Sequence, residues 1–377
     1  MKKIITFIMA VLILFSVVSL HASAQPSLNI DSPSAILIEK TTGKVLFEKD
    51  ADRTMKPASV TKIMTLILIM EAIENGQFTY DDVVVASANA TSMGGSQVYL
   101  KEGEQLTVHE MLKCIVIASA NDACVAMAEY VCGSVDQFVV AMNEKAATLG
   151  MQNTNFENCT GLDSDNHFTT ARDISKMSKE LLRHEKIKEY TTVWMDSIRN
   201  GEFGLTNTNK LIRFYNGATG LKTGYTSQSG YCISATANKD GMELIAVVMN
   251  GETSDSRNAD AKAMLNYGFA NYSLYKPEKI SLQPVKVIKG AQKSVVPKIN
   301  GNTETLISKS QINDVKYTVE ICSDVAAPVE IGQKLGEVKV TVGEEIVSKT
   351  DIISSQVIQK AGVFDIFLEL LKHFLTF

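Results

Sequence analysis

The stretch KPASVTKIMTLILIM, residues 56–70, places Ser59 three residues before Lys62 at the head of an almost unbroken apolar run. Small residues precede the run and Gly76 follows it, a pattern typical of the two ends of a helix. Residues 63–73 are apolar on nearly every side, so this helix is expected to lie buried at the centre of a domain. Ser59 and Lys62 then share one face of its first turn.

A buried lysine beside a serine has a chemical use. Burial disfavours the charged amine, so it lowers the pKa of Lys62 and lets the amine act as a base toward Ser59. Backbone N–H groups at the helix start would stabilise an oxyanion formed beside them. A second Ser-x-x-Lys, residues 273–276, adjoins a proline and opens no apolar helix, so the pattern alone is weak evidence.

Two further motifs accompany the pair. Lys222-Thr223-Gly224 is the chain's single Lys-Thr-Gly and lies between apolar residues at an expected strand. Ser-Ala-Asn occurs at residues 119–121 and again at 87–89, but only the first copy lies at a junction between two helical stretches, where a side chain can point into a site. The three motifs together favour a serine–lysine site assembled from separate parts of one domain.

Length and composition fit an exported protein of two domains. The chain has 377 residues, of which 45% are hydrophobic and 21% charged, and a net charge of −5. Basic residues are neither in excess nor clustered, so no nucleic-acid partner is expected. Residues 1–24 combine a lysine-containing start, an apolar stretch and a final Ala-Ser-Ala, which predicts a signal peptide, with a retained membrane anchor as the alternative.

Six cysteines are spread along the chain, at positions 114, 124, 132, 159, 232 and 322. None has the spacing of a zinc site, so no metal and no other cofactor is expected. Export permits disulfides, but a chain with this much core does not need them. We therefore interpret the cysteines as free thiols of the core.

Hydrophobic periodicity predicts an α/β domain over residues 25–276, with helices packed on an antiparallel sheet. Residues 59–151 have helical spacing, and a closing helix is expected at 258–272. Strands are expected at residues 36–38, 45–47, 220–237 and 242–251. Residues 277–350 alternate apolar and polar side chains, which predicts a second, small all-β domain.

The last segment, residues 351–377, ends in AGVFDIFLELLKHFLTF, which places its charged residues on one helical stripe and its phenylalanines and leucines on the rest. It is too short and too charged to span a bilayer. We predict an amphipathic helix that lies on a membrane surface, with a helix docked on protein as the alternative. Together with the predicted signal peptide, this predicts peripheral attachment at the extracytoplasmic face of a membrane.

Ser59-Val60-Thr61-Lys62, Ser119-Ala120-Asn121 and Lys222-Thr223-Gly224 resemble, in this order, the three motifs of the serine penicillin-recognising enzymes. The flanking stretches ASVTKIMT, TNTNKLI, GLKTGYTSQSGY and AKAMLNYGF extend the likeness over nearly all of the mature chain. Within this group the chain is most similar to low-molecular-mass penicillin-binding proteins that are D-alanyl-D-alanine carboxypeptidases. The resemblance implies a β-lactamase/transpeptidase-like catalytic domain.

The resemblance also implies catalytic roles. Ser59 would attack the carbonyl between the two terminal D-alanines of a peptidoglycan stem peptide and form an acyl-enzyme. Lys62 would take the serine proton, and Ser119 would help to relay it to the leaving amine. β-Lactam antibiotics, which resemble the D-Ala-D-Ala end, would be covalent inhibitors at the same serine.

Substrate contacts are implied for the remaining motif residues. Asn121 would hydrogen-bond the substrate backbone, while Lys222 and Thr223 would meet the substrate carboxylate. The charge of Lys222 would also disfavour protonation of Lys62. Gly224 would let the substrate backbone approach the strand edge.

Two further groups are implied near the motifs. The backbone N–H groups of Ser59 and Tyr225 would form the oxyanion hole. Arg257 falls where the family often has a carboxylate-binding arginine, with an exposed loop arginine as the alternative. Many family members have His-Gly-Leu where this chain reads Cys159-Thr160-Gly161-Leu162, so no residue is assigned to activating the deacylating water.

Two other functions stay open at this point: a β-lactamase of the same fold and a non-catalytic wall-binding scaffold. The β-rich extension and anchor are superfluous for hydrolysing a diffusing drug, and a scaffold would not be acylated at Ser59. A triad hydrolase is poorly supported because Gly-x-Ser-x-Gly is absent. The histidines beyond the signal segment are interpreted as surface or structural residues: His109, His167, His184 and His373.

Overall fold

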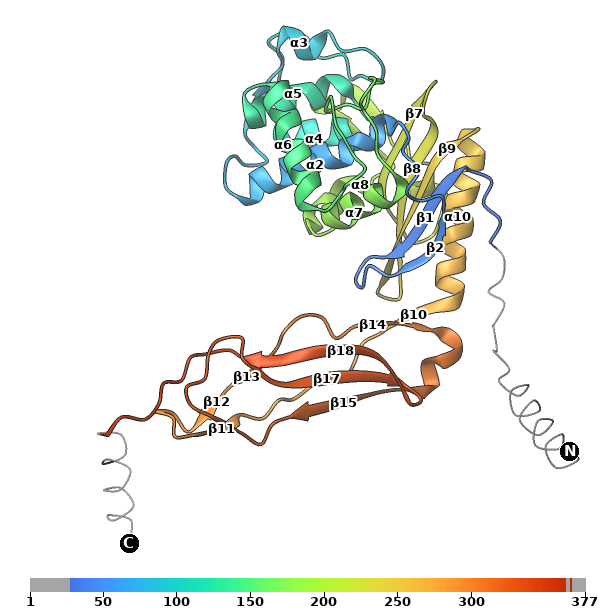
Figure 1. The fold of residues 1–377 in the computed structure, drawn as a ribbon. Helices are drawn as coiled ribbons and strands as arrows, with labels where there is room; N and C mark the ends of the chain where they lie inside the picture. The colour runs from blue at the N-terminus through green and yellow to red at the C-terminus, as the bar shows by residue number, and fades with distance from the viewer. Residues whose placement is uncertain (1–27, 364–366, 368–377) are drawn as a thin grey trace, which may run out of the picture.

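A computed structural model describes residues 28–363 and residue 367. The predicted signal peptide, residues 1–24, lies outside the described residues, and so do residues 364–366 and 368–377 of the predicted amphipathic segment. The described chain forms an α/β domain followed by an elongated β domain (Figure 1). This confirms the predicted fold class.

The α/β domain is built on a five-stranded antiparallel sheet in the order β2-β1-β9-β8-β7. Its strands are β1 (Ser34–Glu39), β2 (Val45–Lys49), β7 (Ala218–Thr226), β8 (Gly230–Lys239) and β9 (Met242–Gly251). The middle of β8 and nearly all of β9 are buried on both faces. Helix α10 (Ser254–Asn271) covers one face of the sheet, and the remaining large helices cover the other (Figure 1). Strands β2 and β7 are the two edge strands.

The helical layer contains α2 (Lys62–Glu74), α3 (Ala88–Thr91), α4 (Val108–Val116), α5 (Asn121–Cys132), α6 (Val135–Thr148), α7 (Ala171–Leu181) and α8 (Lys188–Thr191). The short helix α9 (Leu211–Phe214) belongs to the α10 side, where Leu211 shares a buried cluster with Leu265. Short 3-10 turns are η1 (Ala58–Thr61), η2 (Glu185–Ile187), η3 (Arg199–Gly201) and η4 (Lys309–Asp314). Two small hairpins accompany them: β3 (Val83–Val85) with β4 (Gln105–Thr107), and β5 (Met195–Ile198) with β6 (Phe203–Thr206).

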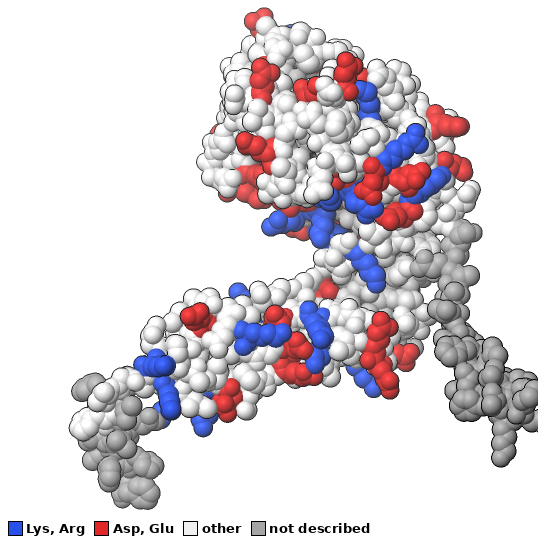
Figure 2. All heavy atoms as spheres, in the orientation of Figure 1, with Lys and Arg blue, Asp and Glu red and all other residues white. Residues whose placement is uncertain are grey.

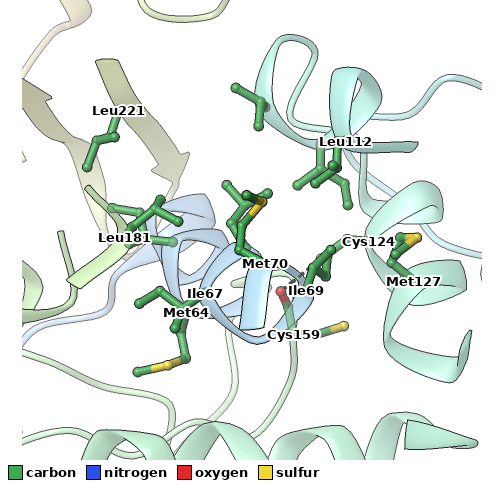
Figure 3. Packing of buried hydrophobic residues seen from close by; sticks show 14 of the residues in the cluster. Met64, Ile67, Ile69, Met70, Leu112, Cys124, Met127, Cys159, Leu181 and Leu221 are labelled. Carbon is green, nitrogen blue, oxygen red and sulfur yellow. Dashed lines mark hydrogen bonds between the residues drawn. The ribbon is translucent and has the colours of Figure 1, made fainter. Parts of the chain in front are cut away.

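Helix α2 is the centre of the core, as the sequence predicts. Its apolar residues pack against side chains of α4, α5 and α7, and Figure 3 shows Ile67, Ile69 and Met70 within this cluster. Each fully buried aliphatic side chain contributes about 1.5–3 kcal/mol of transfer free energy. The core therefore fixes the position of the helix that begins at Lys62.

The cysteines are all free thiols. Cys114, Cys124, Cys159 and Cys232 are buried, as predicted, whereas Cys132 is half-buried and Cys322 is exposed. The prediction of a core position is wrong for Cys322, because it follows the outer strand β15 (Val315–Ile321) of the second domain.

The β domain contains β10 (Tyr272–Tyr275), β11 (Val285–Ile288), β12 (Ser294–Val295), β13 (Pro297–Ile299), β14 (Thr305–Ser308), β15, β16 (Asp324–Ala326), β17 (Lys334–Val342) and β18 (Glu345–Ser354). Its main sheet has the order β13-β18-β17-β15. The expected domain end at residue 350 falls inside β18, and Ile358 is still a buried core residue. The predicted boundary at residue 350 is therefore too early. Strand β18 continues past Thr350 with alternating buried and half-buried residues, and no turn signal in the sequence marks an end there.

Acidic and basic side chains are interspersed over much of the face shown in Figure 2. Among the described residues, no single helix is long and apolar enough to cross a membrane. Helices α5 and α6 reach the required length and hydropathy only jointly, and the pair is bent by 83°. Both helices contribute side chains to the core of the α/β domain.

Candidate active site

The sequence predicts Ser59 in the first turn of the buried helix, whereas the structure places it in the preceding 3-10 turn η1. Side chains at i and i+3 eclipse in a 3-10 turn, so Ser59 and Lys62 still lie on one side. Ala58 has a φ of +48°, a left-handed conformation that is strained for a residue with a Cβ. The chain therefore bends sharply immediately before Ser59.

The amine of Lys62 is buried in a ring of three oxygen atoms. Its Nζ lies 3.0 Å from Ser59 Oγ, 2.6 Å from Asn121 Oδ1 and 2.7 Å from the carbonyl oxygen of Thr160. The side chain has no exposed surface. Asn121 and Thr160 can only accept hydrogen bonds at these atoms, while the serine hydroxyl can donate or accept. A neutral amine therefore gives its two hydrogens to Asn121 and Thr160 and turns its lone pair toward Ser59.

The electrostatics favour this neutral form. Burial lowers the pKa of Lys62, because desolvation penalises the ammonium. Burial also places the pKa of Lys222 well below its usual value, and the nearby charge of Lys62 lowers it further. Two buried lysines that repel one another cannot both stay charged at low cost. The site can therefore hold an amine base beside a hydroxyl.

The loop that supplies Thr160 is fixed by its own side chains. Asn158 Oδ1 accepts hydrogen bonds from the backbone N–H groups of Thr160 and Gly161, at 3.2 and 2.7 Å. Gly161 has a φ of +87°, and a Cβ there would lie 1.9 Å from the carbonyl oxygen of Ala58. This loop reads Cys159-Thr160-Gly161-Leu162 where many family members have His-Gly-Leu. The carbonyl oxygen of Thr160 binds the amine of Lys62, a contact that the sequence does not predict.

The junction between α4 and α5 brings Asn121 to Lys62. Asn121 Nδ2 donates to the carbonyl oxygen of Gly94 at 2.7 Å, which fixes the amide with its oxygen toward the amine. An amide has two N–H groups, and within residues 28–363 the second one has no acceptor, so it can meet a ligand. Ser119 is 4% exposed with a strained φ of +62°, and its hydroxyl makes no hydrogen bond to the described residues.

Strand β7 carries the third motif against the serine turn. Lys222 and Thr223 are buried; Lys222 Nζ donates to the carbonyl oxygen of Thr223 at 3.0 Å, and Thr223 Oγ1 donates to Thr208 Oγ1 at 2.8 Å. At Gly224, a Cβ would lie 2.9 Å from the backbone nitrogen of Ser59. The sequence predicts that this glycine admits a substrate, but in the structure the space is taken by η1 itself.

Tyr225 and Arg257 lie at the edge of this group. Tyr225 is 56% exposed, and its ring centroid lies 4.3 Å from that of Tyr231. Arg257 is buried in α10, so the alternative of an exposed loop arginine is wrong. Its Nη1 donates to the carbonyl oxygen of Cys232 at 3.3 Å, and burial lowers its pKa to about 10. Its charge contributes to the low pKa of Lys222.

A buried histidine supports the serine turn. His167 Nδ1 accepts from the backbone N–H of Glu157 at 3.0 Å, so the ring proton is on Nε2, which lies 2.9 Å from Thr61 Oγ1. Burial lowers the pKa of His167 to about 4. The structural role predicted for this histidine agrees with these contacts.

One cluster outside the motifs has possible metal ligands. Glu71, Glu180 and His184 place ligand atoms within 4.8 Å of one another. Lys145 forms ion pairs with both carboxylates. Burial opposes the charge of Lys145, but hydrogen bonds to Glu71 and Glu180 raise its pKa. Arg183 forms a further ion pair with Glu180. Two cations therefore balance the two carboxylates, and the cluster is a half-buried ion-pair network.

Comparison with known proteins matches both parts of the chain to families. The model of the D-alanyl-D-alanine carboxypeptidase family matches residues 20–253, and that of the penicillin-binding protein 5 C-terminal domain matches residues 269–360. The chain is 43% identical over 339 residues to D-alanyl-D-alanine carboxypeptidase DacF of Bacillus subtilis, covering 88% of this chain and 87% of DacF. It is 31% identical over 361 residues to DacA of Escherichia coli K12, covering 91% and 87%.

Solved structures have the same architecture. Penicillin-binding protein 5 of Haemophilus influenzae is 27% identical and superposes with a TM-score of 0.78, over 88% of this chain and 98% of that one. Ampicillin-bound penicillin-binding protein D2 of Listeria monocytogenes is 29% identical, with a TM-score of 0.60 over 65% of this chain and 100% of that one. Together with the serine–lysine geometry, these matches establish that the chain belongs to the D-alanyl-D-alanine carboxypeptidase family of serine peptidases.

Proposed function

We propose that this serine peptidase removes the terminal D-alanine from peptidoglycan stem pentapeptides through an acyl-enzyme on Ser59. The observation that carries the proposal is the ring of acceptors around Lys62, which directs the lone pair of a neutral amine at the Ser59 hydroxyl. D-alanyl-D-alanine carboxypeptidase is the activity that the names of the relatives give.

In the acylation step, Ser59 Oγ attacks the carbonyl carbon of the penultimate D-alanine while its proton passes to Lys62 Nζ. The backbone N–H groups of Ser59 and Tyr225 stabilise the tetrahedral oxyanion. The C–N bond then breaks, and the proton passes from Lys62 through the Ser119 hydroxyl to the leaving amine. The products are free D-alanine and an ester on Ser59, which water hydrolyses to release the shortened peptide.

Substrate binding uses the buried cations. The substrate carboxylate arrives beside Lys222, Thr223 and Arg257, and its negative charge raises the pKa of Lys222 and restores the ammonium. The free N–H of Asn121 donates to the substrate backbone. Charged hydrogen bonds to the carboxylate select a peptide that ends at this residue, which makes the enzyme a carboxypeptidase.

The remaining predictions concern location. We propose that residues 1–24 are removed on export and that the amphipathic end of the chain attaches the enzyme to the extracytoplasmic face of the cytoplasmic membrane. The support is the sequence pattern of the two ends. Because β18 and Ile358 belong to the β domain, the attaching segment begins near residue 361 rather than at 351.

The test is mass spectrometry of residues 25–377 after incubation with benzylpenicillin, comparing wild type, Ser59→Ala and Ser273→Ala. Ser273 belongs to the second Ser-x-x-Lys and lies in strand β10, so it is the matched control. We expect a stable adduct that only Ser59→Ala loses, and release of D-alanine from a peptide ending in D-Ala-D-Ala. An adduct that clears within seconds would favour a β-lactamase, and no adduct would favour a scaffold.

A further inference from the structure

The end of the β domain from which the chain leaves forms a compact unit, here named the β tip and defined as residues 285–298, 326–333 and 354–363. Backbone hydrogen bonds join its three segments: Ser355 N to the carbonyl oxygen of Val296 at 3.3 Å, Ala361 N to that of Lys289 at 2.9 Å, and Val329 N to that of Ile358 at 2.8 Å. The β tip has its own small apolar core, which includes Val295, Val329 and Ile358.

The surface of the β tip includes large apolar side chains. Five of its aliphatic residues are exposed: Ile288 40%, Val296 54%, Ile331 68%, Val357 48% and Val363 89%. Exposed aliphatic residues scattered singly are normal, but these five come from segments that are hydrogen-bonded to one another. All five therefore belong to the compact unit from which the chain leaves the domain.

The β tip is also basic within an acidic protein. Its three segments contain five lysines, at positions 286, 289, 293, 298 and 360, and a single acidic residue, Glu330. The rest of the domain, residues 272–284, 299–325 and 334–353, contains nine acidic and seven basic residues. All five lysines of the β tip are exposed. Figure 2 shows basic side chains at the end of the β domain that is far from the α/β domain.

The position of the β tip matches this composition. It lies at the end of the β domain that is far from the α/β domain (Figure 1). The chain continues from it into residues 364–377, whose sequence is amphipathic. Lysines attract anionic lipid head groups, and apolar side chains gain free energy by entering the interface below them.

From this combination we propose that the β tip is itself a membrane-docking surface, which rests directly on an anionic phospholipid bilayer. Its lysines contact the lipid head groups, and the exposed aliphatic side chains enter the interface. Two attachments, the β tip and the terminal segment, fix the orientation of the β domain on the membrane. A single point of attachment would leave the height of the active site undefined. The proposal rests on the proposed membrane location and not on the chemistry at Ser59.

The first test places a tryptophan on the surface of residues 25–377. Ile331→Trp marks the β tip, and Ile346→Trp marks an exposed position at the other end of β18, about 26 Å from Ser354 along the strand. Vesicles of phosphatidylcholine and phosphatidylglycerol containing dibrominated lipid quench a tryptophan that enters the bilayer. Trp194, the chain's single tryptophan, contributes equally to both variants.

We expect at least twofold quenching of the tryptophan at position 331 and none at 346. Equal quenching at both positions overturns the proposal. So does an unquenched, blue-shifted tryptophan at 331, which would mean that the terminal segment or a second copy of the chain covers the β tip. If wild type itself fails to bind the vesicles, the membrane attachment fails, whereas bound protein with an unquenched β tip overturns only this proposal.

The second test separates charge from hydrophobicity. The double variant Lys286→Gln/Lys298→Gln removes two exposed lysines of the β tip, and Lys316→Gln/Lys349→Gln removes two exposed lysines elsewhere in the domain. Each lysine near an anionic surface strengthens partition about fivefold. We expect the first variant to bind anionic vesicles at least tenfold more weakly than the second, with no difference on pure phosphatidylcholine and unchanged labelling by benzylpenicillin. Equal binding of the two variants to anionic vesicles overturns the proposal.

Discussion

Lys62 Nζ and Ser59 Oγ lie 3.0 Å apart, at the boundary between the 3-10 turn η1 and helix α2. The lysine side chain is fully buried, and its other two partners are carbonyl oxygens that can only accept. The pair is therefore arranged so that loss of the lysine charge produces a base aimed at the serine. The predictions below follow from this relationship and from the groups that maintain it.

Replacing Lys62 with methionine keeps the volume of the side chain but removes the amine. General-base catalysis contributes about 10²–10⁴ to a rate, so we expect acylation of Ser59 by benzylpenicillin to slow by about 10³. The rate is measured by mass spectrometry of the adduct against time. Near-wild-type acylation in a folded Lys62→Met protein would show that the lysine is not the base.

The acylation rate should depend on pH with a defined sign. The base is the neutral amine, and burial lowers the pKa of Lys62 below that of an ordinary lysine. We therefore expect the rate to be high above the pKa of Lys62 and to fall tenfold per pH unit below it, with this limb at lower pH than a solvent-exposed lysine would give. A limb that persists unchanged in Lys62→Met would assign the titration to another group.

Gly161→Ala should disrupt the contact between the Thr160 loop and the serine turn. The new Cβ would lie 1.9 Å from the carbonyl oxygen of Ala58, at a φ of +87°. Gly103→Ala is the matched control, since its φ is +78° but no atom lies within 4 Å. We expect the control to lose about 1 kcal/mol of unfolding free energy, and Gly161→Ala to lose more and to acylate at least tenfold more slowly. Equal losses of unfolding free energy in the two variants would mean that the Thr160 loop moves away from the serine turn without cost.

His167 should make stability depend on pH below neutrality. Its pKa is lowered by burial to about 4, whereas an unfolded histidine titrates near 6.5. The unfolded state therefore binds the extra proton first, and stability is fully present above pH 6.5 and decreases as the pH falls toward 4. This group accounts for about 2 kcal/mol between pH 7 and pH 5.

Urea unfolding of wild type and His167→Gln at pH 7 and pH 5 measures this contribution. The variant is expected to be less stable at pH 7, because the hydrogen bonds to Thr61 and Glu157 are altered, but to lose less stability on acidification. Parallel losses in the two proteins would assign the acid sensitivity to other groups.

Much of the site follows from local sequence signals. The spacing of Ser59 and Lys62 puts them on one side of either an α-helix or a 3-10 turn, and a continuous apolar run requires a buried helix. The single Lys-Thr-Gly and the Ser-Ala-Asn at the helix junction each have a local context that distinguishes them from chance copies. The matches to a carboxypeptidase family confirm the predicted function.

Other features depend on contacts between distant segments. Three such features involve neighbours that are far away in the sequence. Arg257 is buried in α10, Gly224 leaves room for η1, and the β domain continues beyond residue 350. The sequence does not distinguish a glycine that contacts a substrate from a glycine that contacts another turn. Neither has a side chain whose polarity or size would indicate what lies next to it.

The type of fold, the serine–lysine pair and the motifs that accompany it can be predicted from the sequence, because periodicity and spacing act over a few residues. The groups that keep Lys62 neutral and direct its lone pair at Ser59 depend on tertiary contacts. The Thr160 carbonyl and the Asn121 amide come from segments 98 and 59 residues away, and they meet Lys62 only when the helices close around α2. Burial, and with it the lowered pKa of Lys62, is a property of that packing and not of any local sequence.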